Sequence, residues 1–358
     1  MRLSRAVFSV LLMSAFPIFA APRTYVASFG KDTNACTPEK PCRTFAAAIA
    51  VTDPNGEVTA IDSAEYGPFT LTSVGISVIA APGAHASVTA KGSANAITVN
   101  GPTNGMIALR NLHVTSDGTG FSNGIVIESG GTFTVDHCWI TVPATGIKVN
   151  PPTSAIVAIA DTVVQQAYTG VFIDSPMTPM VTVNRCALTG VHFGVWVSQG
   201  DLVLRNTTVD YAAQTALTVA GVAVNPKVTV ENCVFSHSPT GIYAALGVLS
   251  MRNSTVAKTF NGVAVDGGNV SIDSCIIGGN SGVGVQVYGD AVIGNSTISD
   301  NVTGVAVVSG AVRLTRNSIV RNVTGISVGS GFAYSTGDNM VDGNTTNVVG
   351  TITPATKM

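Results

Sequence analysis

A short phrase of the form Thr-Gly-Val-x-Val recurs along the chain, with apolar and polar residues alternating on either side of it. After Gly124, successive anchor residues of this phrase lie 20 to 25 residues apart. Between anchors, a second alternating phrase occurs, as in FTVDHCWI from Phe133 and VTVNRCAL from Val181. Alternation over such short runs, bounded by Gly, Asn, Asp and Pro, predicts short β-strands separated by turns. The anchors are Ala96, Gly124, Gly146, Gly170, Gly194, Ala216, Gly241, Gly262, Gly284, Gly304 and Gly325.

A repeat of this length cannot bury its apolar face alone, so the repeats must stack on one another. The pattern therefore predicts an all-β fold, a right-handed parallel β-helix with coils of about 22 residues. Each coil contributes GVxV as its first strand, VxVx as its second and a short third strand. The sequence contains neither the Leu-rich phrase nor the helical half of a leucine-rich repeat, and a propeller blade needs roughly 40 residues or more.

Two columns of equivalent residues follow the second strand. The first is rich in asparagine, which tolerates left-handed backbone, and predicts a stacked turn: Asn111, His137, Asp161, Arg185, Asn206, Asn232, Asn253, Ser274, Asn295 and Arg316. In the next column cysteine occupies every second coil, at Cys138, Cys186, Cys233 and Cys275. Two coils separate these cysteines by roughly 9.6 Å, beyond the roughly 7 Å limit for a disulfide, so we expect free, buried thiols.

Composition narrows the class of function. Only 11% of residues are charged, and Lys+Arg 18 against Asp+Glu 20 leaves a net charge of -2. Such a chain has no basic surface to hold a nucleic acid. Arg205, Glu231, Arg252 and Asp273 alternate in sign on consecutive second strands, which predicts a solvated ladder of ion pairs.

Residues 1–20 have the pattern of a signal peptide. Arg2 and Arg5 precede the apolar run 6–19, and Ala20 provides a small residue for cleavage. We therefore expect a secreted protein, periplasmic or extracellular, without a membrane span. An oxidising compartment favours a disulfide between Cys36 and Cys42.

The segment TYVASFGKDTNACTPEKPCRTFAAAIA, residues 24–50, resembles the opening of secreted bacterial right-handed parallel β-helix proteins of the pectate-lyase-like superfamily. The resemblance implies an N-terminal cap over residues 21–60, with a short helix at 43–51. Residues 61–358 would then form the β-helix, ending in a closing segment near 335–353. Proteins of this fold include lyases, hydrolases, epimerases and adhesins, so the resemblance does not specify an activity.

The catalytic motifs of the active relatives are not found in the sequence. Asp136 and His137, in VDHCWI, resemble an Ile-Asp-His segment of pectate lyases whose aspartate helps to bind calcium. Partner carboxylates and an arginine at the required spacing are missing, so calcium is not supported and we expect no cofactor or metal. His85, His113 and His237 fall singly on turns or outward positions, without metal-ligand spacing.

The outward residues of the first strand form the candidate site. Phe172, Trp196 and Tyr243 lie on this face near Glu128, and this combination favours a polysaccharide, whose rings stack on aromatic faces. Non-catalytic polysaccharide binding is the leading hypothesis. A lyase or epimerase would use Lys148, Asp174 or His192, the last of these near Asp210 and Tyr211. In a third alternative, turns cover the aromatic side chains and the protein has a structural role without a ligand. The sequence pattern does not indicate an oligomeric state.

Overall fold

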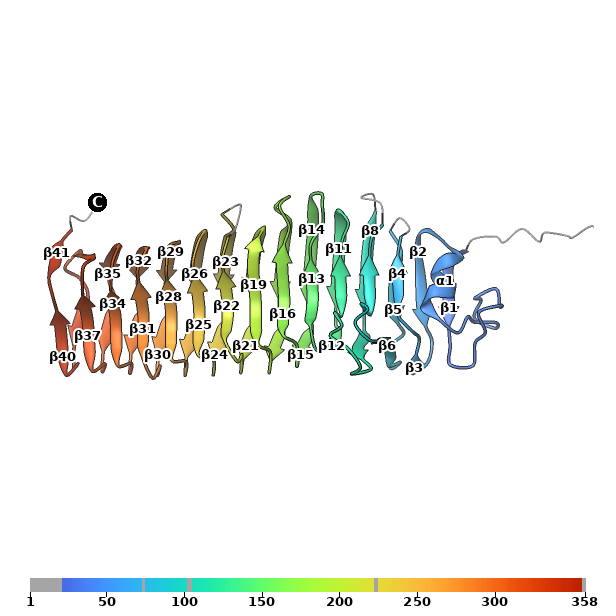
Figure 1. Ribbon diagram of the computed structural model, residues 1–358, viewed down its shortest axis with the longest axis horizontal. Coiled ribbons are helices and arrows are strands. Elements are labelled where there is room, and N and C mark those ends of the chain that lie inside the picture. The colour runs from blue at the N-terminus through green and yellow to red at the C-terminus, as the bar shows by residue number, and fades with distance from the viewer. Residues whose placement is uncertain (1–20, 73–74, 102–104, 222–224, 356–358) are drawn as a thin grey trace, which may run out of the picture.

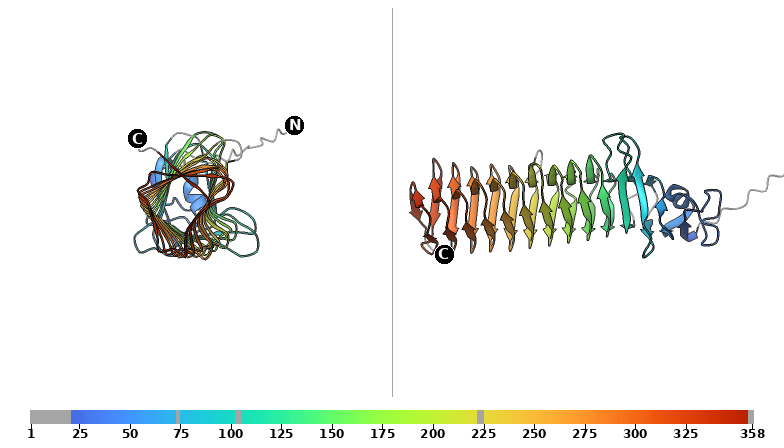
Figure 2. Two further views of the ribbon diagram at one scale, coloured as in Figure 1. Left: turned by 90° about the vertical axis from the view of Figure 1, so that its left-hand side faces the viewer. Right: turned by 90° about the horizontal axis from the view of Figure 1, so that it is seen from below.

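The computed structural model describes residues 21–72, 75–101, 105–221 and 225–355. This part of the chain is an all-β parallel solenoid of about 13 turns, ~22 residues per coil, with one short helix. The coils stack along a single axis into a rod, from the blue N-terminal coils to the red C-terminal ones (Figure 1). In end view the coils superimpose, and turns from the teal part of the chain project from the rod (Figure 2). The predicted fold class is confirmed.

Three parallel sheets run the length of the rod, one for each strand of the coil. The first-strand sheet contains β4 (Phe69–Leu71), β7 (Ile97–Val99), β10 (Ile125–Ile127), β13 (Thr145–Val149), β16 (Thr169–Asp174), β19 (Phe193–Gln199), β22 (Thr215–Val219), β25 (Thr240–Ala244), β28 (Asn261–Val265), β31 (Val283–Val287), β34 (Thr303–Val307), β37 (Thr324–Val328) and β40 (Thr346–Val349). The second-strand sheet contains β1 (Ala21–Val26), β2 (Thr52–Ala60), β5 (Ser77–Ala80), β8 (Met106–Arg110), β11 (Gly131–Asp136), β14 (Ala155–Ala160), β17 (Met180–Asn184), β20 (Asp201–Arg205), β23 (Lys227–Glu231), β26 (Val248–Arg252), β29 (Asn269–Asp273), β32 (Asp290–Gly294), β35 (Ala311–Thr315), β38 (Phe332–Ser335) and β41 (Ile352–Pro354). The third-strand sheet contains β3 (Ala64–Glu65), β6 (Ala86–Ala90), β9 (Leu112–Ser116), β12 (Trp139–Thr141), β15 (Val163–Gln165), β18 (Ala187–Thr189), β21 (Thr208–Asp210), β24 (Val234–Ser236), β27 (Thr255–Ala257), β30 (Ile276–Gly278), β33 (Thr297–Ser299), β36 (Ser318–Val320) and β39 (Met340–Asp342).

Equivalent residues of successive coils pair directly with one another. Val171 of β16, for example, pairs with Ile147 on one side and Val195 on the other, and all three are buried. Because side chains alternate across a strand, each inward column adds one apolar layer to a continuous core. The residues between them form outward columns with the same register.

The turn after the second strand is left-handed in every coil where the sequence predicts it. All ten residues of the predicted column have φ between 48° and 58°. Asn232 Nδ2 donates to Asn206 Oδ1 at 3.4 Å, as a stacked asparagine turn requires. Asp161 and Arg185 occupy neighbouring positions of this column and pair with each other, because Arg185 binds both carboxylate oxygens of Asp161.

The four cysteines of the neighbouring column are buried and free, as predicted. The hydroxyl residues that alternate with them have a specific role. Thr162 Oγ1 accepts a hydrogen bond from the backbone N–H of Cys138 at 3.3 Å and donates to the carbonyl of Ala160 at 2.8 Å. The same pattern recurs at Thr207, Ser254 and Ser296. A hydroxyl in this column therefore satisfies backbone groups that would otherwise be buried without partners.

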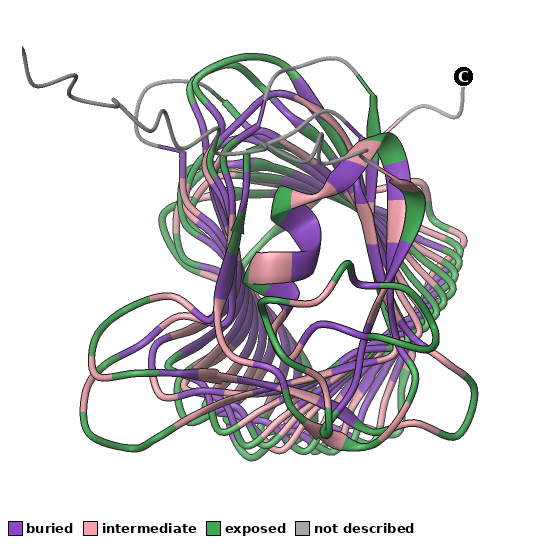
Figure 3. Ribbon diagram, turned by 90° about the vertical axis from the view of Figure 1, so that its right-hand side faces the viewer, coloured by how far each residue is buried: buried purple, intermediate pink, exposed green. Residues whose placement is uncertain are grey.

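A short helix, α1 (Phe45–Ala50), covers the N-terminal end of the core (Figure 3). It begins later than the predicted 43–51 because Thr44 has extended backbone and caps the helix, accepting from the N–H of Ala47. Phe45 packs against the rings of Tyr66 and Phe69. Among the described residues no helix is long and apolar enough to cross a membrane.

The remaining N-terminal and C-terminal predictions concern the ends of the rod. The disulfide Cys36–Cys42 is formed, with its Cα atoms 4.6 Å apart. The predicted signal peptide lies outside the described residues. Residues 332–354 form β38 to β41, which continue the three sheets, and the segment expected to close the rod therefore has the form of a further coil. Val348 and Val349 in this coil are exposed.

The predicted ion-pair ladder on the second-strand sheet is formed in three of its four positions. Glu231 lies between Arg205, at 3.2 Å, and Arg252, at 3.0 Å. Asp273 was predicted to extend this ladder, but its carboxylate accepts hydrogen bonds from Asn295 Nδ2 at 2.6 Å and from Ser274 Oγ. The left-handed turn brings these two donors close to Asp273, and its expected pairing with Arg252 is not observed among the described residues.

Candidate functional site

The predicted outward column of the first-strand sheet is in register. Phe172 pairs with Lys148 on one side and with Trp196 on the other, and Trp196 pairs with Thr218. The rings of Phe172 and Trp196 are in contact, with centroids 5.8 Å apart. Register alone thus brings these aromatic residues together on the outer face.

Phe172 and Trp196 belong to a larger group of touching rings. The Trp196 ring lies 4.9 Å from Phe193, and Phe193 lies 5.6 Å from Tyr168. Tyr168 stacks on His192 at 4.7 Å and contacts Phe121 edge-on at 6.1 Å. We call these six residues the aromatic array: Phe121, Tyr168, Phe172, His192, Phe193 and Trp196.

The array begins at the corner where the third strand turns into the first strand. Tyr168 precedes β16, and Phe193 is the first residue of β19. The backbone N–H of Phe193 donates to the carbonyl of Tyr168 at 2.8 Å, and that of Tyr168 donates to Pro143 at 3.1 Å. These hydrogen bonds stack successive turns, so that their side chains are stacked as well.

One end of the array is open to solvent. Phe121 is 60% exposed and Tyr168 is 46% exposed, whereas the remaining rings are half-buried. Large aromatic side chains gathered at one exposed place are typical of a binding surface, because soluble proteins rarely leave such apolar area uncovered.

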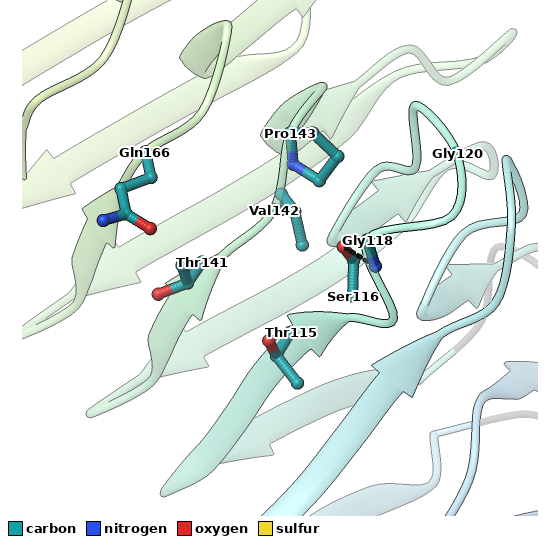
Figure 4. Close-up of a pocket in the computed structure, with 8 residues that line it drawn as sticks. All are labelled: Thr115, Ser116, Gly118, Gly120, Thr141, Val142, Pro143 and Gln166. Atoms are coloured by element: carbon teal, nitrogen blue, oxygen red, sulfur yellow. Dashed lines mark hydrogen bonds between the residues drawn. The ribbon is translucent and has the colours of Figure 1, made fainter.

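A depression of about 360 Å³ is lined by Gly120, which directly precedes Phe121 in the chain, and by Pro143, whose carbonyl accepts from the N–H of Tyr168. Thr115, Thr141 and Gln166, from successive coils, form one side of it, and Ser116 and the turn that carries Phe121 contribute the rest (Figure 4). The depression therefore offers hydroxyl and amide groups close to the turns that carry the exposed rings. It is also lined by Gly118, Gly120, Val142 and Pro143.

Three polar atoms near the other end of the array are shielded from solvent and lack a hydrogen-bond partner in the described part of the chain. They are Trp196 Nε1, Gln199 Oε1 and Thr218 Oγ1. A buried polar group without a partner costs roughly 1–3 kcal/mol. Because such groups lower the stability of the isolated chain, their presence beside the array indicates that this region has a role other than stabilising the fold.

The charged residues predicted for this face have no hydrogen bond or ion pair with one another in the described structure. Asp174 accepts a hydrogen bond from Gln199 Nε2 at 3.2 Å, and Glu128 is exposed just beyond the end of β10. His192 lies against Tyr168 at the corner. In the described ranges, no hydrogen bond or ion pair joins Lys148, Asp174 and His192 to one another.

Tyr243 lies in the predicted column but outside the array. Thr218 stands between it and Trp196 in the register of the sheet. Its hydroxyl donates to Asp266 Oδ2 at 2.9 Å. Burial, and then this hydrogen bond, raise the pKa of Tyr243 above its usual value.

Asp210 and Tyr211 also form a separate cluster. Asp210 Oδ1 lies 2.7 Å from His237 Nδ1 and accepts from Ser236 Oγ at 2.7 Å. The ring of Tyr211 stacks on His237, with centroids 4.6 Å apart. These side chains are directed to one another, and none of their contacts involves His192.

Asp136, His137 and Asp161 bring potential metal-ligating atoms within 4.8 Å of one another. The two carboxylates already have cationic partners, because Arg110 Nε lies 2.9 Å from Asp136 and Arg185 forms two hydrogen bonds to Asp161. The hydrogen bonds from Arg185 hold the pKa of Asp161 below its usual range. The arrangement is a network of ion pairs, in which the two arginines supply the positive charge that a metal ion would otherwise bring.

Phe121, Tyr168 and Phe193 are the site residues that sequence reasoning missed. The outward column contains only residues within strands, whereas these three precede an anchor glycine by one to three residues. An aromatic residue in that short interval is the signal that could have identified them.

Comparisons with known proteins bear on the fold. Residues 169–346 match the family model described as a right handed beta helix region. No curated protein matches the sequence. The A-module of a mannuronan C-5 epimerase from Azotobacter vinelandii is similar in structure, with a TM-score of 0.59 and 14% identity over 85% of this chain and 91% of that chain.

Two further solved structures show weaker similarity. The Dettilon tailspike protein has a TM-score of 0.48 and 10% identity, over 93% of this chain and 68% of that chain. The pectate lyase Pel9A has a TM-score of 0.45 and 12% identity, over 88% of this chain and 80% of that chain. At these identities the epimerase module establishes a shared fold and no shared activity. The chain is therefore a right-handed β-helix protein with structural similarity to a mannuronan epimerase module, as the resemblance of its opening segment to the pectate-lyase-like superfamily led us to expect.

Proposed function

We propose that this is a secreted protein that binds an extracellular or cell-envelope polysaccharide through the aromatic array, without catalysis. The observation that carries the proposal is the continuity of the array, from exposed Phe121 to half-buried Phe172. The similar epimerase module is named for mannuronan, a polysaccharide, which is consistent with this ligand class.

The chemistry of a sugar chain fits such a surface. The apolar faces of pyranose rings stack on aromatic side chains, while their hydroxyls need hydrogen-bonding groups at the edges. Thr115, Thr141 and Gln166 supply such groups close to the turns that carry the exposed rings. An array that crosses several coils also suits a polymer better than a single sugar.

The arrangement of charged groups favours binding over catalysis. A lyase or epimerase needs an acid and a base within hydrogen-bond reach of one sugar. Lys148, Asp174 and His192 are not linked in the described structure, and His192 is part of the aromatic stack.

The test compares the two tryptophans of the chain. Binding of the purified protein to acidic and neutral polysaccharides, with and without calcium, is measured together with the ultraviolet absorbance of unsaturated uronic products. We expect binding without product, and a loss of about tenfold or more in affinity for Trp196→Ala, equivalent to about 1.4 kcal/mol. Trp139→Ala is the matched control, because Trp139 is exposed on the third-strand sheet, outside the array.

Each result separates the alternatives. Product formation would establish the lyase alternative and direct mutagenesis to Lys148, Asp174 and His192. An epimerase would leave no unsaturated product, so the bound polymer is also analysed by NMR for inverted uronic residues. Absence of binding to every polysaccharide would favour the structural role.

Export is tested separately. We expect the protein recovered from the cell envelope or medium to begin near Ala21, which N-terminal sequencing measures. Retention of residues 1–20 would contradict secretion through this segment.

A further inference from the structure

Large apolar side chains are exposed on the outer face of the second-strand sheet, which is a different sheet from the one that carries the aromatic array. Ile156 of β14 and Met180 of β17 pair in register and are 55% and 57% exposed. Met106 of β8 is also exposed and lies in the same outward column, with Thr132 between it and Ile156. The neighbouring outward column of these strands contains only alanine and threonine, so the larger side chains project beyond it. Soluble proteins rarely leave such apolar groups uncovered together.

A depression lies on the same face, farther toward the C-terminus. It has a volume of about 310 Å³ and crosses β26, β29, β32 and β35. The exposed side chains of Val248 and Val292 line it, together with Ser250 and Ser271. An apolar projection and an apolar depression therefore lie on one face of the rod, several strands apart.

Opposite charges lie on the two strands between the projection and the depression. Asp201 begins β20 and Lys227 begins β23, and the pairing of Leu202 with Val228 places the two charged residues next to each other in the same outward column. The backbone N–H of Lys227 donates to Asp201 Oδ1 at 3.2 Å. Its side chain is exposed, and its ammonium group forms no ion pair with any other described residue.

We propose that two copies of this chain associate through this face as a two-fold symmetric dimer with antiparallel rods. A two-fold axis that runs parallel to the strands, midway between β20 and β23, places Asp201 of each copy opposite Lys227 of the other. The same axis places β17 opposite β26 and β14 opposite β29 of the second copy, because the two strands of each pair are equally far from the axis. Met180 and Ile156 of each copy then face the depression of the other, and this contact occurs twice.

The charges of the whole face agree with this register. From β8 to β35, each charged outward residue lies opposite an uncharged residue or one of opposite charge. Arg205 lies opposite Glu231 of the other copy, for example, and Asp290 lies opposite Thr132. Like charges in apposition would cost several kcal/mol. The axis that pairs Asp201 with Lys227 is thus also the one that fits the projection to the depression.

The dimensions of the face favour a second copy over another kind of partner. A stack of strands about 4.8 Å apart is matched over many strands only by a stack with the same repeat. The face from β8 to β35 measures roughly 48 Å by roughly 16 Å, or roughly 800 Å² per copy, which is the area that a stable interface buries. The aromatic array belongs to another sheet, so it stays accessible in both copies.

Sedimentation equilibrium of the purified protein tests the proposal. We expect a species of twice the mass of one chain. Asp201→Lys and Lys227→Glu should each weaken association by about tenfold or more, because each places like charges opposite one another twice. Lys40→Glu is the matched control for the charge change, because Lys40 is exposed in the turn between Cys36 and Cys42 and should leave association unchanged.

A mixture of the two charge variants provides the second readout. The Asp201→Lys chain and the Lys227→Glu chain carry complementary charges, so an equimolar mixture should form a dimer with one copy of each, detected by a tag on one of them. Val248→Glu places a charge in the depression, and we expect it to weaken association without recovery on mixing with either charge variant. A protein that is monomeric up to roughly 1 mM, a trimer, or a dimer that both charge variants retain would overturn the proposal. Failure of the mixture to associate, when both variants have the circular dichroism of the unmodified protein, would overturn it as well.

Discussion

Asn322 accepts two hydrogen bonds from Asn301 of the preceding coil through a single oxygen. The backbone N–H and the Nδ2 of Asn301 both donate to Asn322 Oδ1, each at 3.0 Å. The same arrangement links Asn280 to Asn301 and Asn322 to Asn344. Asn280, Asn301 and Asn322 are almost fully buried, so a ladder of amides lies inside the corner between the third and first strands.

Replacement of one amide in this ladder should destabilise the fold. Asn322→Ala removes the oxygen to which the backbone N–H and Nδ2 of Asn301 donate, and although Nδ2 keeps the carbonyl of Ile277, the buried backbone N–H loses its acceptor, which costs about 1–3 kcal/mol. We expect a lower midpoint of thermal unfolding by circular dichroism. The control is Asn269→Ala, at an exposed position at the start of β29. Equal midpoints for the two variants would show that the ladder contributes nothing.

The anchor glycines should resist replacement for a steric reason. A Cβ on Gly304 would lie 2.6 Å from the carbonyl oxygen of Gly325 and 3.0 Å from Ile319. Because both neighbours belong to the core wall, we expect Gly304→Ala to cost about 1–3 kcal/mol, as overpacked sites do. Denaturant unfolding measures the change. Ala216→Gly, in the same column, provides the comparison and should cost less, since it creates no overlap.

The buried thiols should be inert in the folded protein and should make it sensitive to alkaline pH. Burial raises the pKa of Cys138 to about 12 and that of Cys275 to about 11. The unfolded chain therefore releases thiol protons at lower pH than the folded chain. The free energy of unfolding should therefore keep this contribution below the ordinary thiol pKa of roughly 8.5, and it should decrease as the pH rises above that value.

Two measurements check this prediction. Titration with a disulfide reagent at pH 8 should detect almost no thiol in the native protein and four after denaturation. An added cysteine at an exposed position, Thr208→Cys, should react at once in the native state and serves as the control. Rapid reaction of the native thiols would mean that this column opens to solvent.

The aromatic array predicts a different set of binding residues from the outward column. We expect Tyr168→Ala to weaken polysaccharide binding to a similar extent as Trp196→Ala, because Tyr168 connects the exposed end of the array to Phe193. Tyr243→Phe should retain full affinity, since Tyr243 lies outside the array and uses its hydroxyl for Asp266. Affinity measured on the same polysaccharide distinguishes the two. If Tyr243→Phe alone lost binding, the binding residues would be those of the outward column and not those of the aromatic array.

Periodicity predicted the parts of this structure that repeat. The left-handed column and the contact of Phe172 with Trp196 follow from counting residues between anchors, because an in-register stack converts equal spacing into contact. The buried asparagines escaped prediction, since an amide such as Asn301 is expected at the surface unless a partner in the next coil satisfies it. Tyr168 escaped because it lies in a turn, and the conformation and length of the turns vary from coil to coil.

The in-register stack also determines how such a protein can change its length. Because each coil repeats the same inward columns, duplication of one whole coil would add one strand to every sheet and lengthen the rod by about 4.8 Å. The core would gain one layer of the same kind, and both flanks would keep their partners. Deletion of a single strand residue would instead exchange the inward and outward sides of that strand. Variation by complete coils is therefore tolerated by the scaffold, and a binding surface built across coils can be extended by copying its units.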